Sequence, residues 1–318
     1  MNVVQRMGDS VTFLRQVWEN KALLRVLLGS ENFAFVRDYL PGHFYSPIPD
    51  LSELREQTRA SCGEAIENLP AIELNESRQV QMTDTFAHFY GELPFPDKQS
   101  RQFRYFFDNP YFSYGDGVIL YSFLRSFKPA RVVEVGSGFS SAEMLDCNDV
   151  FFDGALDFVF VEPHPERLYS LLSERDKSTY KIIVKPVQRV DAAVFRSLAQ
   201  NDILFIDASH VGKSHSDVLH ILFEILPKLN KGVLVHFHDV MWPFEYPQSW
   251  LEEGRAFNEA YFLRAFLQYN SAFEVVFFNS FMVAKHAELL RMKMPRMLKS
   301  PSTPETIGNS SLWLRKIA

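Results

Sequence analysis

The chain has 318 residues, of which 47% are hydrophobic, and its formal net charge is −6. This length and apolar content are sufficient for one large α/β domain with a smaller appendage. A nucleic-acid partner is not expected, because binding a phosphate backbone requires a basic face and the sequence has no block of Lys and Arg.

Cysteine usage and hydropathy indicate the compartment. The sequence has two cysteines, Cys62 and Cys147, which lie far apart and indicate a reducing compartment without a disulfide framework. The segment Met1–Gly29 lacks the uninterrupted apolar core of a signal peptide, and no apolar run approaches the length that spans a bilayer. We therefore expect a cytoplasmic protein with no membrane partner.

The N-terminal part of the sequence predicts helices and no strand. Apolar residues recur at helical spacing from Leu14 to Leu28, and the segments 51–69 and 80–90 predict two further helices. Between the first two helices, the prolines and aromatic rings of residues 41–49 exclude regular structure. This loop either packs on the core or forms a wall of a substrate cleft.

The chain is predicted to divide near residue 110. Residues 1–110 are expected to form a helical cap that controls substrate access, and residues 111–318 the main domain. Within the main domain, a helix is predicted from Asp116, as its N-cap, to Phe127, and this helix leads into the first strand.

A glycine turn follows that strand. In residues 131–135, three valines surround Glu134, and this segment leads directly into Gly136, Gly138 and the start of a helix. Glycine allows a positive φ and a close approach of the backbone to a ligand, and the first turn of a helix offers unpaired N–H groups. The turn therefore predicts a site for a nucleotide-like ligand.

Two interpretations of this turn compete. One is the dinucleotide fingerprint G-x-G-x-x-G, and the other is the looser E-x-G-x-G turn that holds S-adenosylmethionine in class I methyltransferases. Ser141 occupies the third glycine position, which weakens the dinucleotide interpretation, and Glu134 favours the other. Glu162, at the end of a second apolar strand, could accept the ribose hydroxyls of either cofactor and does not separate them.

Two further apolar strands end in ionisable residues. Asp207 and His210 follow the first of these strands, and His238 and Asp239 follow the second. The carboxyl ends of parallel strands share one edge of an open sheet, so these side chains are expected to converge there with Glu162. Apolar residues at helical spacing between the two strands, ended by a proline, predict a right-handed crossover.

With these residues the sequence resembles the class I S-adenosylmethionine-dependent methyltransferases that carry Asp-x-x-His after the fourth strand. It is similar over nearly the whole chain to an uncharacterised bacterial group, and in its catalytic half to metal-dependent O-methyltransferases that act on sugar hydroxyls. Where those sugar enzymes have two adjacent acids, this chain has His238 and Asp239. The likeness to the bacterial group lies in residues 44–50, 112–116, 134–141, 205–210 and 236–239.

The resemblance implies a Rossmann-like, seven-stranded class I methyltransferase sheet with helices on both faces. It also implies S-adenosylmethionine as cofactor and O-methylation of a hydroxyl on a small molecule or sugar-containing natural product. The residues that it implies for cofactor binding are Tyr114, Glu134, Gly136, Ser137, Gly138, Ser140, Ser141, Glu162 and Asp207.

The catalytic residues are expected at the strand ends. His210 is the candidate base, because an unperturbed imidazole titrates near the working pH, and Asp207 is expected to assist it. Asp207, His238 and Asp239 are the candidate ligands of a divalent metal, for which Mg, Mn and Fe all remain open.

The C-terminal part predicts the end of the sheet. Residues 273–278 and 311–317 are expected to be two closing strands, and a helix is predicted from about Glu253 to Tyr269. The aromatic residues from Trp242 to Trp250 either form an apolar rim for the acceptor or anchor their loop. An NAD-dependent oxidoreductase and a non-catalytic cofactor-binding protein are the alternatives, and the acceptor and a homo-oligomeric state are left open.

Overall fold

The computed structural model describes residues 39–40, 42–60, 68–303 and 306–318. The chain divides into two compact units, Met1–Glu64 and Ala65–Ala318. The described part of the first unit holds the aromatic loop and helix α4 (Leu51–Ala60), which confirms the start of the helix predicted over 51–69. The predicted helix at Leu14–Leu28 lies outside the described residues.

The second unit is built on a seven-stranded sheet with the order β3-β2-β1-β4-β5-β7-β6. Strands β1 to β5 are parallel, and β7 runs antiparallel between β5 and β6. This order confirms the sheet expected for a class I methyltransferase, including the two closing strands. The strands are β1 (Arg131–Val135), β2 (Asp157–Val161), β3 (Lys181–Ile183), β4 (Ile203–Ile206), β5 (Leu234–Phe237), β6 (Phe273–Phe278) and β7 (Leu312–Lys316).

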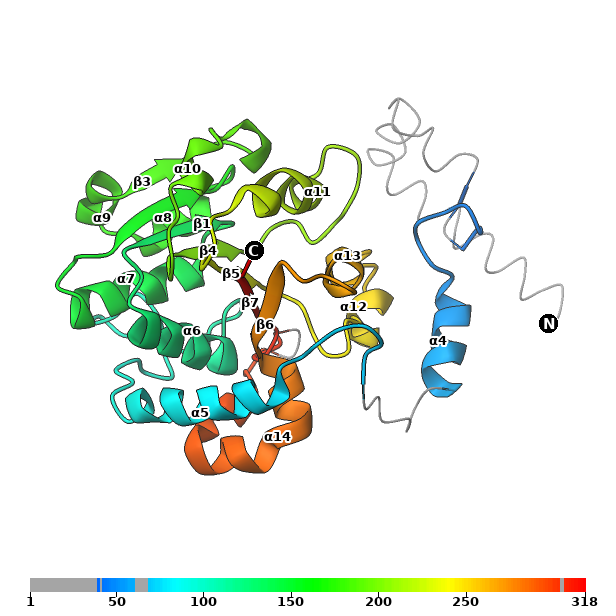
Figure 1. Cartoon of the computed structure of the whole chain (residues 1–318), viewed down its shortest axis with the longest axis horizontal. Coiled ribbons are helices and arrows are strands. Elements are labelled where there is room, and N and C mark those ends of the chain that lie inside the picture. The colour runs from blue at the N-terminus through cyan, green and yellow to red at the C-terminus, as the bar shows by residue number, and fades with distance from the viewer. Residues whose placement is uncertain (1–38, 41, 61–67, 304–305) are drawn as a thin grey trace, which may run out of the picture. The chain divides into compact units, whose positions relative to one another are not determined.

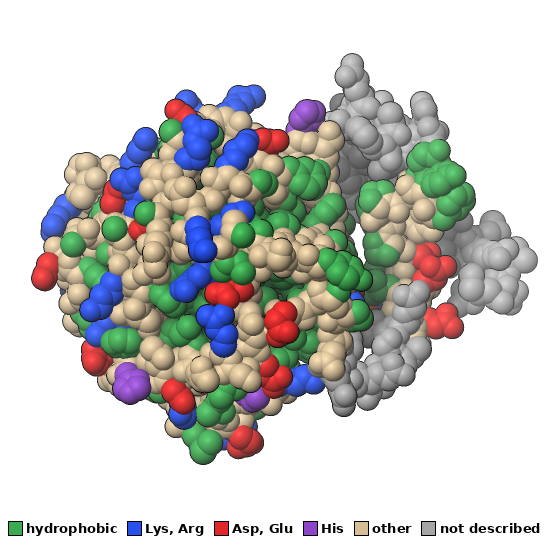
Figure 2. Space-filling view, viewed as in Figure 1, with side chains coloured by type: hydrophobic (Ala, Val, Ile, Leu, Met, Phe, Trp, Pro, Cys, Tyr) green, Lys and Arg blue, Asp and Glu red, His purple; other side chains and the backbone are tan. Residues whose placement is uncertain are grey.

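Helices cover both faces of this sheet, with α6 and α7 on one side and α11 and α13 on the other (Figure 1). The longer helices of the unit are α5 (Glu76–Tyr90), α6 (Tyr114–Phe127), α7 (Phe139–Phe151), α13 (Glu259–Leu267) and α14 (Asn279–Lys293). The shorter ones are α8 (Glu166–Leu171), α9 (Glu174–Thr179), α10 (Ala193–Arg196), α11 (Asp217–His220) and α12 (Gln248–Glu252). On the face drawn in Figure 2, Lys and Arg side chains lie among Asp and Glu.

The core is formed by strands that are buried on both faces. All four residues of β4 are buried, which agrees with the continuous apolar run expected of a central parallel strand. Large aromatic rings join the layers: Trp313 of β7 stacks on Phe123 of α6 with ring centroids 3.8 Å apart. The sheet edge that carries the ionisable residues is thus held on a rigid support.

Helix α5 belongs to the same unit as the sheet. Its residue Phe86 is fully buried, with ring centroids 5.2 Å from Phe123 of α6 and 5.4 Å from Phe277 of β6. The compact division of the chain therefore falls at Glu64, and a functional boundary near residue 110 stays a prediction.

Several expected boundaries differ in the structure. Helix α6 begins at Tyr114 after Ser113 as N-cap, so Asp116 lies inside the helix, where it is fully buried. The helix predicted after β4 continues from α11 into a π-helical turn (Ile221–Ile225) and a 3-10 turn. The helix predicted over residues 253–269 is confined to α13, and α14 was not predicted.

The described helices give no sign of a membrane span. None of them is both long enough and apolar enough to cross a bilayer.

Candidate functional site

A pocket of about 250 Å³ opens at the carboxyl ends of the central parallel strands. It brings together most of the residues that the sequence predicted, from the glycine turn and from the ends of β2, β4 and β5. Its lining comprises Tyr111, Phe112, Gly136, Ser137, Gly138, Phe139, Ser140, Glu162, Arg167, Asp207, Ala208, His210, His238, Asp239, Arg255 and Phe257.

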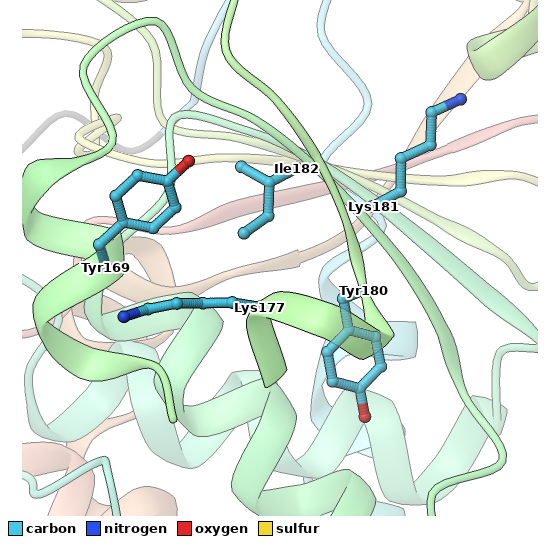
Figure 3. A pocket seen from close by; sticks show the side chains of 5 residues that line it. All are labelled: Tyr169, Lys177, Tyr180, Lys181 and Ile182. Atoms are coloured by element: carbon cyan, nitrogen blue, oxygen red, sulfur yellow. The ribbon is translucent and has the colours of Figure 1, made fainter. Parts of the chain in front are cut away.

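A larger hollow elsewhere lacks such a set of groups. Figure 3 shows the side chains of one hollow of about 630 Å³ at the edge strand β3: Tyr169, Lys177, Tyr180, Lys181 and Ile182. Lys177 is paired with Glu174 at 2.7 Å, and the Tyr180 hydroxyl accepts a hydrogen bond from the Asn148 amide. The chemistry predicted from the sequence is therefore concentrated in the smaller pocket.

The two glycines of the turn differ in their backbone conformation and in the space around them. Gly136 has a φ of 80°, and a Cβ there would lie 1.7 Å from the carbonyl oxygen of Asp207. Gly138 has a φ of −176°, which any residue adopts, and a Cβ there would lie 3.2 Å from Cδ of Arg167. The predicted need for a positive φ is confirmed at Gly136 and is wrong at Gly138.

Glu162 is fixed beside this turn. The backbone N–H of Ser137 donates to one of its carboxylate oxygens at 2.9 Å, and that of His164 donates to the other at 2.8 Å. Each oxygen has further acceptor capacity, and Glu162 lines the pocket. A carboxylate held in this way can accept hydroxyl groups from a ligand.

Glu134 supports the turn from behind. It is fully buried and accepts hydrogen bonds from the hydroxyls of Ser140, at 2.6 Å, and Ser141. Ser141 in turn accepts the N–H of Gly138 at 3.0 Å. Burial raises the pKa of Glu134 to about 8, although the serine hydrogen bonds oppose this shift. Of these residues, Ser140 and Gly138 line the pocket, whereas Glu134 and Ser141 lie beneath it.

Tyr114 lies apart from the other predicted cofactor residues. It is buried at the start of α6, and its ring is parallel to that of Phe107 with centroids 5.9 Å apart. The pocket lining does not include it.

His210 stands among three carboxylates. Its Nδ1 lies 2.9 Å from Oε2 of Glu259, and its Nε2 lies 3.3 Å from Oδ1 of Asp207 and 3.6 Å from Oδ2 of Asp239. Burial alone would lower the pKa of His210, but the hydrogen bonds to Asp207 and Glu259 outweigh it and hold that pKa well above its ordinary value. The surrounding carboxylates thus favour the imidazolium form of His210.

His238 completes the cluster from β5. Its Nδ1 lies 3.4 Å from Oδ1 of Asp207 and 3.6 Å from Oδ1 of Asp239, and its Nε2 lies 3.2 Å from the hydroxyl of Ser310. Burial would lower the pKa of His238, but the charges of Asp239 and Asp207 raise it well above the ordinary value. Burial would likewise raise the pKa of Asp207, but the charge of His238 holds it well below its usual range.

The predicted metal ligands have suitable chemistry but not the arrangement of a metal centre. Among the described residues, no three His, Cys, Asp or Glu side chains are placed so that they could hold one ion. Asp207 and Asp239 instead face the imidazoles of His210 and His238, at distances of 3.3 to 3.6 Å. As arranged, the residues do not fit a metal site.

Sequence patterns missed several residues of the site. Glu259 lies 49 positions after its partner His210, and no local motif marks it. Arg167 lies with its guanidinium carbon 3.7 Å from the ring centroid of Tyr111, at the wall beside Gly138. Asp116, expected only as a cap, instead accepts the N–H of Ser310 at 2.9 Å behind His238.

The structure tests the prediction for the aromatic segment 242–250 but not the prediction for the loop of residues 41–49. Tyr246 and Trp250 are buried and pack their rings against Phe257, so they anchor their loop and do not line the pocket. In the first unit, Phe44 and Tyr45 are 80% and 65% exposed. Whether that loop forms a wall of the acceptor cleft stays a prediction.

Known proteins resemble this chain in its central part. Residues 133–240 match the family described as "Methyltransferase domain". An uncharacterized protein of Archaeoglobus fulgidus is 28% identical over 199 residues, which cover 61% of this chain and 89% of that relative.

Two solved structures are similar at low identity. The Podospora anserina methyltransferase PaMTH1, bound to S-adenosylhomocysteine (SAH), is 16% identical, with 85% of this chain and 98% of that chain covered and a TM-score of 0.39. The Streptomyces achromogenes O-methyltransferase TomG, in complex with S-adenosylmethionine (SAM), is 13% identical, with 84% and 96% covered and a TM-score of 0.38. Because these TM-scores are low, the fold is assigned from the strand order of this chain and not from these two structures.

Proposed function

We propose, from the methyltransferase-family match over residues 133–240 and the strand order of the sheet, that the chain transfers the methyl group of SAM to a hydroxyl oxygen of a small molecule. Sugar-containing natural products are the acceptor class that the sequence resemblance favours. The observation that carries the proposal is that His210 and Asp207 line the same pocket as the glycine turn and Glu162.

We assign the cofactor to the turn side of the pocket. Gly136, Ser137 and Gly138 expose backbone there, and Glu162, with both oxygens fixed by backbone N–H groups, is suited to accept ribose hydroxyls. Ser140 and Asp207 line the same space. Glu134 and Ser141 act on the cofactor indirectly, because they hold the turn in shape.

The reaction needs one base beside the acceptor. When bound, SAM supplies a methyl group on a cationic sulfur, which becomes a neutral thioether as the O–CH₃ bond forms. A positive charge bound beside His210 would lower its pKa, so the Nε2 proton of the imidazolium would pass to solvent before the transfer. Nε2 of His210 then takes the proton from the acceptor oxygen as the new bond forms. Asp207, 3.3 Å from that nitrogen, can accept a hydrogen bond from it once the imidazole has taken the proton.

The remaining expectations concern the metal and the surroundings. The sequence resemblance predicts a divalent ion held by Asp207, His238 and Asp239. We propose a metal-independent transfer instead, because no group of three described side chains is placed to hold one ion and none of the steps above requires it. We further propose that the enzyme acts in the cytoplasm and that residues 1–110 control acceptor access.

Calorimetry and a transfer assay test the proposal. The purified protein should bind SAH saturably and show no heat of binding with NAD or NADH. It should also transfer labelled methyl groups from SAM to members of a panel of phenols and sugars. Saturable NAD binding without any response to SAH would contradict the methyltransferase assignment.

A further inference from the structure

Helix α13 is tied to the loop that carries the candidate base. The helix begins at Glu259, after Asn258 as N-cap. The backbone N–H groups of Asn258 and Glu259 both donate to the carbonyl oxygen of His210, at 3.0 and 3.1 Å. The Asn258 side chain also accepts the N–H of Gly212 at 2.5 Å. These bonds hold His210, which has a positive φ of 58°, against the first turn of α13.

The side chains of His210 and Glu259 form a buried pair. Glu259 is 1% exposed and His210 is 7% exposed, and the distance from Nδ1 of His210 to Oε2 of Glu259 is 2.9 Å. The second carboxylate oxygen, Oε1, is buried and has no hydrogen-bond partner among the described residues. The imidazole is therefore the side-chain group on which this carboxylate acts.

Such a carboxylate decides which nitrogen of a neutral imidazole carries the proton. A neutral imidazole has one donor and one acceptor nitrogen, whereas an ionised carboxylate only accepts. Nδ1 has the nearest carboxylate, that of Glu259 at 2.9 Å, whereas the carboxylates at Nε2 lie 3.3 and 3.6 Å away. Nδ1 therefore keeps the proton of the neutral ring and donates it to Glu259, which leaves the lone pair on Nε2. Nε2 is the nitrogen that lies near Asp207 and Asp239, both of which line the pocket.

We propose that Glu259 is a positioning residue, which holds His210 in the Nδ1–H tautomer and directs the Nε2 lone pair toward the acceptor hydroxyl. This inference rests on the proposed function, in which His210 takes the acceptor's proton. As Nε2 takes that proton the imidazole becomes a cation, and the charge of Glu259 stabilises it. Without that charge, a neutral His210 can carry its proton on Nε2, and no lone pair then faces the pocket.

Nitrogen NMR of the purified protein, with no ligand added, tests the tautomer directly. The histidines are labelled with nitrogen-15, spectra are recorded at a pH where His210 is neutral, and its signals are identified by their loss in His210→Gln. The wild type should show a protonated Nδ1 and an unprotonated Nε2 at His210, and Glu259→Gln should lose this pattern. A wild-type His210 with its proton on Nε2, or an unchanged spectrum in Glu259→Gln, would overturn the inference.

Glu76→Gln is the matched control for this substitution. Glu76 is also the first residue of a helix, α5, and its Oε1 lies 2.8 Å from Nε2 of His286, away from the pocket. The same chemical change at Glu76 should leave the His210 signals where they are.

Turnover separates a positioning role from a structural one. With an acceptor from the panel of phenols and sugars, Glu259→Gln should lower kcat roughly tenfold or more, while KM for SAM and Tm stay near wild type. Glu259→Asp keeps the charge and should recover part of the loss. Wild-type kcat in a folded Glu259→Gln would overturn the inference. Absence of SAM binding by the wild type would instead contradict the proposed function, and the NMR result would be unaffected.

Discussion

The carbonyl oxygen of Asp207 lies where a side chain on Gly136 would have to begin. A Cβ at Gly136 would stand 1.7 Å from that oxygen, and the backbone N–H of Asp207 donates to Val135 at 2.8 Å. The turn assigned to the cofactor and the strand end assigned to catalysis are therefore packed backbone against backbone. A shift of the turn would therefore displace the strand end, and a shift of the strand end would displace the turn.

Gly136→Ala should for this reason disrupt both. The change forces apart two backbones and places a side chain at positive φ, so we expect a loss of unfolding free energy of at least about 1–3 kcal/mol and loss of SAH binding. Gly154→Ala is the control, because Gly154 also has a positive φ, 77°, but has nothing within 4 Å of a Cβ. Urea denaturation and calorimetry measure the two effects. Equal behaviour of the two variants would contradict the packing argument.

Local signals were sufficient to predict the central strands and their ends, whereas the seven-stranded sheet was predicted from the family resemblance. Apolar runs marked β1, β2, β4 and β5, and because parallel strands end at one edge, their terminal residues could be brought together in advance. Asp207 and His238, 31 positions apart by their numbering, indeed lie 3.4 Å apart. The glycine turn was recognisable because the positive φ at Gly136 favours glycine, and that residue is visible in the sequence.

Contacts between distant segments could not be predicted from local sequence patterns. Asp116 bonds Ser310, 194 positions away, and Glu259 meets His210 through a helix end whose placement depends on the whole domain. Tyr114, predicted near the cofactor from resemblance alone, packs on Phe107 because α6 directs its ring that way. Sequence patterns predict which residues end strands, whereas tertiary packing decides which side chains meet.

Glu162→Gln should weaken cofactor binding while the fold is retained. The amide keeps the size of the side chain, but it loses the charge that strengthens hydrogen bonds to ligand hydroxyls, which is worth about 1.5–3 kcal/mol. Its NH2 group also cannot accept one of the two backbone N–H groups that fix Glu162. We therefore expect SAH affinity to fall roughly tenfold to a hundredfold by calorimetry. Glu166→Gln, an exposed acid in the first turn of α8, is the control and should bind like the wild type. Unchanged affinity in Glu162→Gln would remove Glu162 from the cofactor site.

His236 should make the unfolding free energy depend on pH. It is fully buried, stacks on Phe205 with ring centroids 3.7 Å apart, and bonds Ser311 at 2.8 Å. Burial lowers the pKa of His236 well below its ordinary value of 6.5. Below that pH the unfolded chain binds a proton that the folded chain does not, so this residue's contribution to stability falls as the pH falls.

The comparison with His236→Gln isolates this contribution. The wild type should be the more stable protein at neutral pH, and its advantage should shrink by about 1.4 kcal/mol per pH unit below 6.5. Urea denaturation of both proteins at a series of pH values measures the difference. Parallel curves for the two proteins would show that His236 is not a buried neutral imidazole.

Turnover is expected to survive exhaustive chelation. Among the described side chains, no group of three His, Cys, Asp or Glu is placed to hold one ion, and the proposed proton transfer to His210 requires no metal. Activity is measured before and after dialysis against a chelator, and then with Mg, Mn or Fe added singly. Loss of activity that one of these ions restores would establish the metal predicted at Asp207, His238 and Asp239.

His210→Gln should abolish most of the turnover and leave cofactor binding intact. A general base contributes about a hundredfold or more to the rate, and it acts mainly in the transition state. We therefore expect kcat to fall roughly a hundredfold or more, with SAM affinity close to wild type. His286→Gln is the control, since His286 also bonds a glutamate, Glu76, but lies outside the pocket. If His210→Gln turns over normally, another group must take the proton, and Asp207, which faces both imidazoles of the cluster, becomes the residue to replace next.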